Sequence, residues 1–262
     1  MPRTYTHRHR RRRPRHHPPR TRKSPKSPSP HRPKTRSIWA NWKQRTITYP
    51  KRPTHLKLSQ LDRIPYVNEH RQPITLDNER EEQYVSHDCI APESTVLELG
   101  GRYGVVSAVI NHKLERPTRH VVVEPDPSVM NCLRINKTSH RCHFRIVNGI
   151  VSRRPQYFLP KGYASQTHAT PSTKASVPVP TYTVEDLQRK YHLTFDTLVA
   201  DCEGCLCDFV KENTALVTQQ LKSIMFEADL PKRCDYGWIR GVLRKAGFTE
   251  VIGGFVSFWK KA

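Results

Sequence analysis

The stretch from Val96 to Gly104, Val-Leu-Glu-Leu-Gly-Gly-Arg-Tyr-Gly, constrains the fold of this chain more than any other. Its apolar start predicts a short buried strand. The three glycines that follow predict a turn in which the backbone can approach a ligand without β-carbons in the way. The apolar run Val105–Ile110 can then open a helix. A strand, a glycine turn and a helix in this order are typical of a nucleotide-type cofactor site, with the ligand at the helix N-terminus.

The rest of the chain repeats the order of strand and then helix. The pattern predicts strands at 95–99, 120–124, 143–147, 197–200 and 222–226, and helices at about 104–113, 127–137, 184–191, 205–213 and 236–246. Residues 248–252 and 255–259 flank Gly253-Gly254 and predict a hairpin. The proline-rich segment 153–180 is expected to form a long loop or hairpin over the site. We therefore expect an α/β fold with a mostly parallel sheet, helices on both faces and one antiparallel strand near an edge.

Positive charge is concentrated at the N-terminus. Residues 1–57 hold 19 of the 45 lysines and arginines and none of the 23 acidic residues, so the net charge of +22 belongs mainly to this segment. Residues 1–55 are predicted to be a disordered Arg/Pro/Ser-rich tail, 56–94 a lead-in with a helix at about 78–87, and 95–262 the main domain. Such a tail can bind nucleic acid or another polyanion, or it can be a solubilising extension.

Seven cysteines without a regular spacing predict reduced thiols in an intracellular protein. No apolar run approaches the length of a membrane span, which predicts a soluble protein, cytoplasmic or nuclear. The motif Cys202-x-x-Cys205-x-Cys207 resembles part of a zinc site, but four ligands are needed and the others would be distant. We therefore expect no metal site.

An acidic residue supports the cofactor interpretation of the glycine turn. Glu124 ends the next predicted strand, twenty residues after Gly104, where a carboxylate can accept hydrogen bonds from two ribose hydroxyls. The dinucleotide fingerprint Gly-x-Gly-x-x-Gly is not met, because Arg102 follows the Gly100-Gly101 pair. This favours an adenosyl cofactor that has no pyrophosphate. The alternative is a tight strand-to-helix turn beside a surface glutamate.

The glycine turn and Glu124 stand at the expected spacing, and residues from about 79 to 262 resemble the FkbM-type S-adenosylmethionine-dependent methyltransferases. The matching pieces are the glycine turn, Glu124-Pro125-Asp126-Pro127 with Leu133 and Asn136, Asn148-Gly149-Ile150-Val151-Ser152, the helix Val184-Glu185-Asp186-Leu187, and Asp196-Thr-Leu-Val-Ala-Asp201-Cys-Glu203-Gly204. The resemblance implies a Rossmann-like class I methyltransferase fold with a seven-stranded sheet for residues 95–262, and S-adenosylmethionine as the cofactor.

The same resemblance implies roles for individual residues. Those around the methionine end of the cofactor would be Glu98, Gly100, Gly101, Arg102 and Gly104. Glu124 would hold the ribose, and Asn148 with Gly149 would lie near the adenine. The chain departs from the family at two places. It has Gly101-Arg102 where the family has alanine and asparagine, and Leu206 where the family tends to have a second glutamate.

Asp201 and Glu203 are the candidate catalytic residues. They follow the fourth strand of the predicted sheet, where open α/β sheets present reactive groups. Asp201 can accept the proton of an acceptor hydroxyl or hold the acceptor, and its alternative role is to cap the following helix. Glu227 is a weaker candidate of the same kind.

The expected function is methyl transfer, by in-line displacement, to a hydroxyl of a sugar, glycan or small molecule. The basic tail motivates one alternative, a nucleic-acid methyltransferase. The other is a non-catalytic, basic nucleic-acid-binding protein in which the methyltransferase-like domain is only a scaffold.

Overall fold

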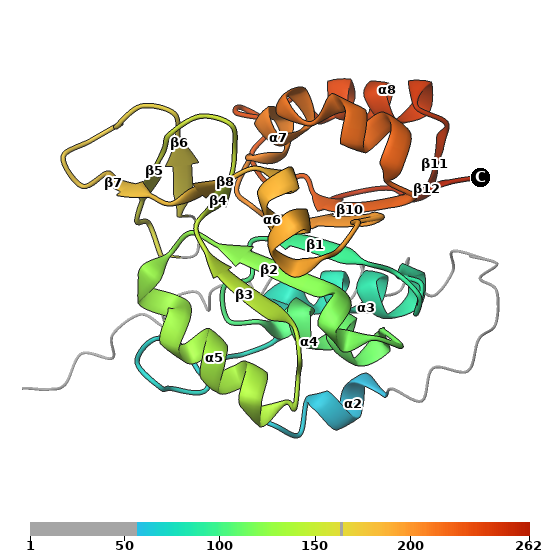
Figure 1. Cartoon of the computed structure of the whole chain (residues 1–262). Coiled ribbons are helices and arrows are strands. Elements are labelled where there is room, and N and C mark those ends of the chain that lie inside the picture. Colours follow the sequence, from blue (N-terminus) through green and yellow to red (C-terminus); the bar gives the residue numbers. More distant parts are fainter. Residues whose placement is uncertain (1–56, 163–164) are drawn as a thin grey trace, which may run out of the picture. The chain divides into compact units, whose positions relative to one another are not determined.

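The computed structural model describes residues 57–162 and 165–262 (Figure 1). The predicted disorder of residues 1–55 concerns residues outside this part of the chain. The main sheet has seven strands, in the order β11 (Phe248–Ile252), β12 (Val256–Lys261), β10 (Ser223–Glu227), β9 (Thr197–Ala200), β1 (Val96–Leu99), β2 (His120–Glu124) and β3 (Arg145–Asn148). The strands from β10 to β3 are parallel, and β12 is antiparallel to both of its neighbours.

This strand order confirms the predicted fold. The chain builds outwards from β1 through β2 to β3, and then returns to the other side of β1 to add β9 and β10. The last two strands form the predicted hairpin, and β12 inserts between β10 and the edge strand β11. A parallel sheet with one antiparallel strand next to its edge is the arrangement of the Rossmann-like methyltransferase fold.

Helices cover both faces of the sheet (Figure 1). The α-helices are α2 (Leu58–Leu61), α3 (Arg80–Cys89), α4 (Val105–Lys113), α5 (Met130–Ser139), α6 (Val184–Tyr191), α7 (Leu206–Glu212) and α8 (Tyr236–Lys245). The short helical turns are η1 (Asp77–Glu79), η2 (Pro117–Arg119), η3 (Pro127–Val129) and the π-helix η4 (Leu216–Gln220). None of the helices in the described residues has the length and apolar character needed to cross a bilayer.

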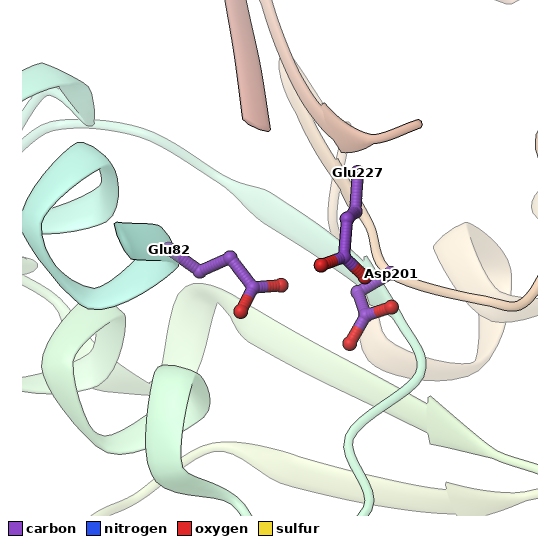
Figure 2. A group of neighbouring side chains, drawn as sticks. All are labelled: Glu82, Asp201 and Glu227. Carbon is purple, nitrogen blue, oxygen red and sulfur yellow. The ribbon is translucent and has the colours of Figure 1, made fainter. Parts of the chain in front are cut away.

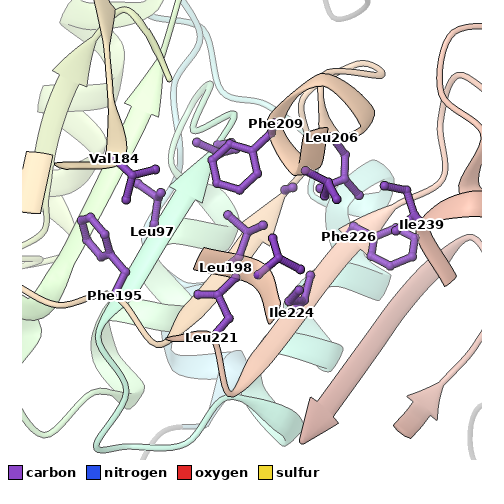
Figure 3. Close-up of a cluster of buried hydrophobic side chains, with 14 of the residues drawn as sticks. Leu97, Val184, Phe195, Leu198, Leu206, Phe209, Leu221, Ile224, Phe226 and Ile239 are labelled. Atoms are coloured by element: carbon purple, nitrogen blue, oxygen red, sulfur yellow. The ribbon is translucent and has the colours of Figure 1, made fainter. Parts of the chain in front are cut away.

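Alternating residues of the central strands pack against these two helical layers. Val121 and Val123 of β2 join the larger core cluster, which contains residues of α6, α7 and α8 (Figure 3). Val122, between them, faces the opposite way and packs with residues of α4 and α5. Burial on both faces explains why these strands are continuous apolar runs in the sequence rather than alternating ones.

Residues 150–182 form two small sheets beside the main one. β4 (Ile150–Val151) pairs with β8 (Thr181–Tyr182), and β5 (Gln156–Leu159) pairs with both β6 (Gln166–His168) and β7 (Val177–Val179). The pairs made by β5 are antiparallel, so the hairpin interpretation of 153–180 is confirmed. The strands of this segment are short and β7 contains a proline, so the sequence shows no clear strand periodicity here.

Candidate functional site

A pocket opens at the carboxyl ends of the parallel strands. Its lining includes the residues that end or follow five of them: Gly100 after β1, Glu124 on β2, Gly149 after β3, Asp201 after β9 and Glu227 on β10. The order of the strands reverses between β1 and β9, which makes this the topological switch point of the sheet. Open α/β sheets bind their ligands at such a point.

The glycine turn brings two strand ends close together. Gly100 has φ +91°, and a β-carbon there would lie 1.6 Å from the carbonyl oxygen of Asp201. A β-carbon on Gly101 would lie 2.2 Å from Cγ1 of Val122. Both positions therefore need glycine for space. Gly104 is the N-cap of α4 and does not line the pocket, so its predicted contact with the cofactor gains no support from its position.

Arg102 is held at the pocket by several contacts. Its backbone is left-handed, with φ +33°, and its amide donates to Oε2 of Glu124 at 2.8 Å. Its guanidinium donates to the Tyr103 hydroxyl at 3.2 Å, stacks over that ring, and lies 3.9 Å from Oδ2 of Asp126. Tyr103 in turn donates to Glu69 at 2.5 Å. A strained backbone that is fixed by its surroundings is a feature of binding sites.

Glu124 lies in the pocket wall with its carboxylate already oriented. Its second oxygen, Oε1, accepts from the amide of Asp126 at 2.7 Å, so each oxygen holds one backbone N–H. Burial raises the pKa of Glu124 to about 7, against the opposing effect of these hydrogen bonds. Each oxygen retains a lone pair for a further donor, which is what a pair of ribose hydroxyls requires.

Asn148 and Glu98 have structural partners that sequence analysis did not anticipate. The Asn148 amide donates to the backbone carbonyls of Glu124 and Pro125, and Asn148 does not line the pocket, whereas Gly149 does. Glu98 lines the pocket, but its two carboxylate oxygens bind Ser107 at 2.7 Å and His120 at 2.6 Å, both buried. Asn148 therefore positions the end of β2, and Glu98 ties β1 to α4 and β2.

Carboxylates gather on the other side of the pocket. Asp201 and Glu227 share a side-chain hydrogen bond, and Glu82 of α3 points towards both (Figure 2). Burial is the main cause of the raised pKa of Asp201, to about 6, and of Glu227, to about 10. A hydrogen bond between two carboxyl groups requires one proton, which this pair shares.

Glu203 and Glu79 extend this acidic wall. Glu203 lines the pocket with a left-handed backbone, φ +52°, and burial raises its pKa to about 7. Burial likewise raises the pKa of Glu79, on η1, to about 8. In total nine carboxylate side chains and two arginines line the pocket. A pocket of this composition attracts cations, although the whole chain is strongly basic.

The small sheet of β5, β6 and β7 supplies the remaining wall. Phe158 of β5 and Thr167 of β6 line the pocket, and Phe158 is buried. Arg233, from the loop before α8, donates to the backbone carbonyls of Thr167 and Glu203. It therefore links the small sheet to the acidic loop after β9. This confirms that the segment 153–180 lies over the site.

Two disulfides correct the prediction of reduced thiols. Cys202 is bonded to Cys205, and Cys207 is bonded to Cys234; Cys89, Cys132 and Cys142 stay outside disulfides. The prediction was wrong because Cys207 and Cys234 are 27 residues apart, and only the packing of α7 against the segment before α8 brings them together. The first bridge closes the turn that carries Glu203, and both of its cysteines line the pocket.

Most of the expected site residues thus meet in one pocket: Glu98, Gly100, Gly101, Arg102, Glu124, Gly149, Asp201 and Glu203. Glu79 and Glu82 also line the pocket but were not among the expected site residues, because they fall in the helix predicted at about 78–87. The signal was the spacing of Glu82 from Val85 and Ser86, at i+3 and i+4, which places it on the buried face of α3.

No family model and no curated protein matches the chain. Among solved structures, precorrin-6y C5,15-methyltransferase from Geobacter metallireducens is similar over 72% of this chain and 90% of its own, with 12% identity and a TM-score of 0.44. A putative O-methyltransferase from Klebsiella pneumoniae covers 86% of this chain and 97% of its own, with 14% identity and a TM-score of 0.41. An O-methyltransferase from Bacillus cereus in complex with SAH covers 82% and 94%, with 11% identity and a TM-score of 0.39. Similarity at this level decides neither the substrate nor the site residues of this chain.

Proposed function

We propose that the chain is a methyltransferase that uses S-adenosylmethionine and methylates a hydroxyl oxygen of a sugar, glycan or small molecule. The observation that carries this proposal is the pocket at the topological switch point, where nine carboxylates surround a glycine turn. S-adenosylmethionine bears a sulfonium and an ammonium group, so an acidic pocket favours it over a phosphate-bearing nucleotide. When bound, this cofactor supplies the electrophilic methyl group.

The residues divide between binding and proton transfer. Glu124 accepts hydrogen bonds from the ribose hydroxyls, and Arg102 pairs with the carboxylate of the methionine moiety. Asp201 orients the acceptor hydroxyl and takes its proton as the oxygen forms its bond to the methyl carbon and the carbon–sulfur bond breaks. A side-chain hydrogen bond to Glu227 holds Asp201 in its orientation.

The acceptor class follows from the charge of the pocket. A nucleic-acid substrate brings phosphates close to the reacting atom, and the acidic wall at Asp201 and Glu203 would repel them. A neutral hydroxyl acceptor meets no such repulsion. The basic residues 1–55 would then bind a polyanion separately from catalysis, for which salt-sensitive binding that is lost on their deletion is the test.

The test of this function is a transfer assay with methyl-labelled S-adenosylmethionine across glycan, small-molecule, nucleic-acid and protein fractions. We expect label in a hydroxyl-bearing fraction, and a fall of about 100-fold or more in turnover for Asp201→Asn. Cofactor affinity, measured by calorimetry, should not change in that variant. Asp77→Asn, an identical change at an exposed position outside the pocket, is the matched control.

Each contrary result has a clear meaning. Label confined to nucleic acid would replace the hydroxyl acceptor with the nucleic-acid alternative. Cofactor binding without transfer to any fraction would favour a scaffold without catalysis. No binding of S-adenosylmethionine to the full chain would end the proposal.

A further inference from the structure

Three carboxylates from separate elements converge at one side of the pocket (Figure 2). They belong to Glu82 on α3, Asp201 after β9 and Glu227 at the end of β10. One oxygen from each lies within 4.8 Å of the other two. Three oxygens this close together can reach one common ion through small rotations of their side chains.

Glu82 shows that this cluster lacks a component. Its side chain is buried, with 2% of the residue's surface exposed, and Oε1 has no hydrogen-bond partner among the described residues. The carboxylate points towards Asp201 and Glu227 (Figure 2). A buried carboxylate oxygen without a donor destabilises the folded state, so a native structure rarely leaves one unsatisfied.

The basic side chains of the described residues do not supply that partner. No lysine, arginine or histidine among them lies within ion-pair distance of Glu82, Asp201 or Glu227, although other acids of the chain make such pairs. A positive charge placed between the three carboxylates would supply that partner.

We propose that Glu82, Asp201 and Glu227 bind a hard divalent cation, Mg²⁺ or Mn²⁺. Carboxylate oxygens are the ligands these ions prefer, and soft metals would call for thiolates or imidazoles. Three protein ligands leave about three positions of an octahedral ion for water or substrate oxygens. This differs from the sequence-based expectation of no metal site.

The inference deepens the proposed function and rests on it for one consequence. An ion at this place faces the pocket, so the open positions are available to oxygens of the acceptor. The ion would displace to solvent the proton that Asp201 and Glu227 share. A coordinated hydroxyl would lose its proton more readily, and Asp201, bound to the ion through one oxygen, would keep the other for that proton. The acceptor class narrows to molecules with two neighbouring oxygens that can share one ion, such as a vicinal diol.

The experiment is a titration of the full chain with Mn²⁺, in which electron paramagnetic resonance follows the free ion. We expect one saturable Mn²⁺ per chain, displaced by Mg²⁺, and a dissociation constant at least tenfold weaker in Glu82→Gln. Glu81→Gln, the same change on the neighbouring residue of α3, lies outside the cluster and should bind like the wild type. Failure of the wild type to bind, or equal binding by the wild type and Glu82→Gln, would overturn the proposal.

A second measurement guards against a variant that fails to fold. Mn²⁺ should raise the melting temperature of the wild-type chain, and a chelator should reverse the rise. Glu227→Gln should lose this response as Glu82→Gln does. If the three acids share protons only, Mn²⁺ will leave the melting temperature of the wild type unchanged, which also refutes the site.

The two proposals fail in different ways. Calorimetry with S-adenosylmethionine in the presence of a chelator tests the cofactor pocket alone. Cofactor binding without Mn²⁺ binding would refute the cation site and leave the proposed function standing. Mn²⁺ binding that is sensitive to Glu82→Gln, without cofactor binding, would keep the site and refute the methyltransferase.

Discussion

The carbonyl oxygen of Asp201 occupies the space that a β-carbon on Gly100 would need, because the two would lie 1.6 Å apart. The glycine turn after β1 and the acidic loop after β9 therefore fit only when residue 100 has no side chain. Asp201 is fixed from this side by its own amide, which donates to the carbonyl of Leu99 at 3.0 Å. The wall of the pocket at the glycine turn and its acidic wall share this contact.

Gly100→Ala should destabilise the protein by about 2–4 kcal/mol, because the new methyl group displaces Asp201 and the residue has a positive φ. Denaturant unfolding measures the loss. Gly241→Ala is the matched control, since Gly241 lies inside α8 with nothing within 4 Å of an added β-carbon. It should stabilise the protein by about 0.5–1 kcal/mol. Equal stability of the two variants would show that the strand ends can separate without cost.

The affinity for S-adenosylmethionine should rise about tenfold between pH 6 and pH 8. The reason is that Glu124, whose pKa burial raises to about 7, accepts ribose hydrogen bonds best when it is ionised. Calorimetry at a series of pH values measures the rise. In Glu124→Gln the affinity should be weaker and this component of the pH dependence should disappear. An unchanged profile in the variant would assign the titration to another carboxyl group.

The raised pKa of Glu124 has the opposite effect on stability: the free energy of unfolding falls as the pH rises. In the unfolded chain Glu124 loses its proton near pH 4.5, while in the folded protein it keeps the proton up to about pH 7. Its contribution to the free energy of unfolding is therefore complete below pH 4.5 and falls by about 3 kcal/mol as the pH rises to about 7. Glu124→Gln has no such proton. The stability of the variant relative to the wild type should increase over this interval and stay constant above it.

Arg102→Asn separates backbone strain from ligand binding. Asparagine adopts the left-handed conformation of residue 102 more readily than arginine, so the gain there offsets the lost contacts with Tyr103 and Asp126. We expect a melting temperature within a few degrees of the wild type and an affinity for S-adenosylmethionine about five- to tenfold weaker. Arg116→Asn, the same change at an exposed position outside the pocket, serves as the control. Full affinity in Arg102→Asn would mean that the guanidinium serves only its protein neighbours.

The bridge between Cys207 and Cys234 should contribute more stability than the bridge between Cys202 and Cys205. It closes a loop with a sequence separation of 27, against 3 for the other, and longer loops lose more entropy on closure. Replacing Cys207 and Cys234 by alanine together should lower the free energy of unfolding by about 2–4 kcal/mol. The matching double variant of Cys202 and Cys205 should lose roughly half as much. Equal losses would argue against a chain-entropy origin.

The hydrophobic pattern predicted helices and strands correctly where apolar positions coincide with buried ones. The expected bounds of α6, β9 and β11 are those observed, because each is a short apolar or amphipathic run between clear turn signals. The strand β3 was expected at 143–147 and is observed at Arg145–Asn148. Phe144 precedes the strand, although it is buried with Val122 in the core beside α4 and α5. Local pattern thus finds the element but places its ends less well.

What the sequence could not supply depends on contacts between distant elements. The pairing of Cys207 with Cys234 follows from tertiary packing, and so does the meeting of Glu82 with Asp201, 119 positions later in the chain. The partners of Glu98 also come from α4 and β2 rather than from its own strand. Each of these residues has an ordinary local context, so only the folded chain shows its role.

The bridge between Cys202 and Cys205 has a practical consequence for anyone who prepares this protein. Both sulfur atoms belong to the pocket wall, one residue and four residues after Asp201. A batch purified with dithiothreitol and a batch purified without it are therefore expected to differ in covalent structure beside Asp201. Activities measured on the two batches would belong to two different molecules. A titration of free thiols distinguishes the oxidised protein from the reduced one.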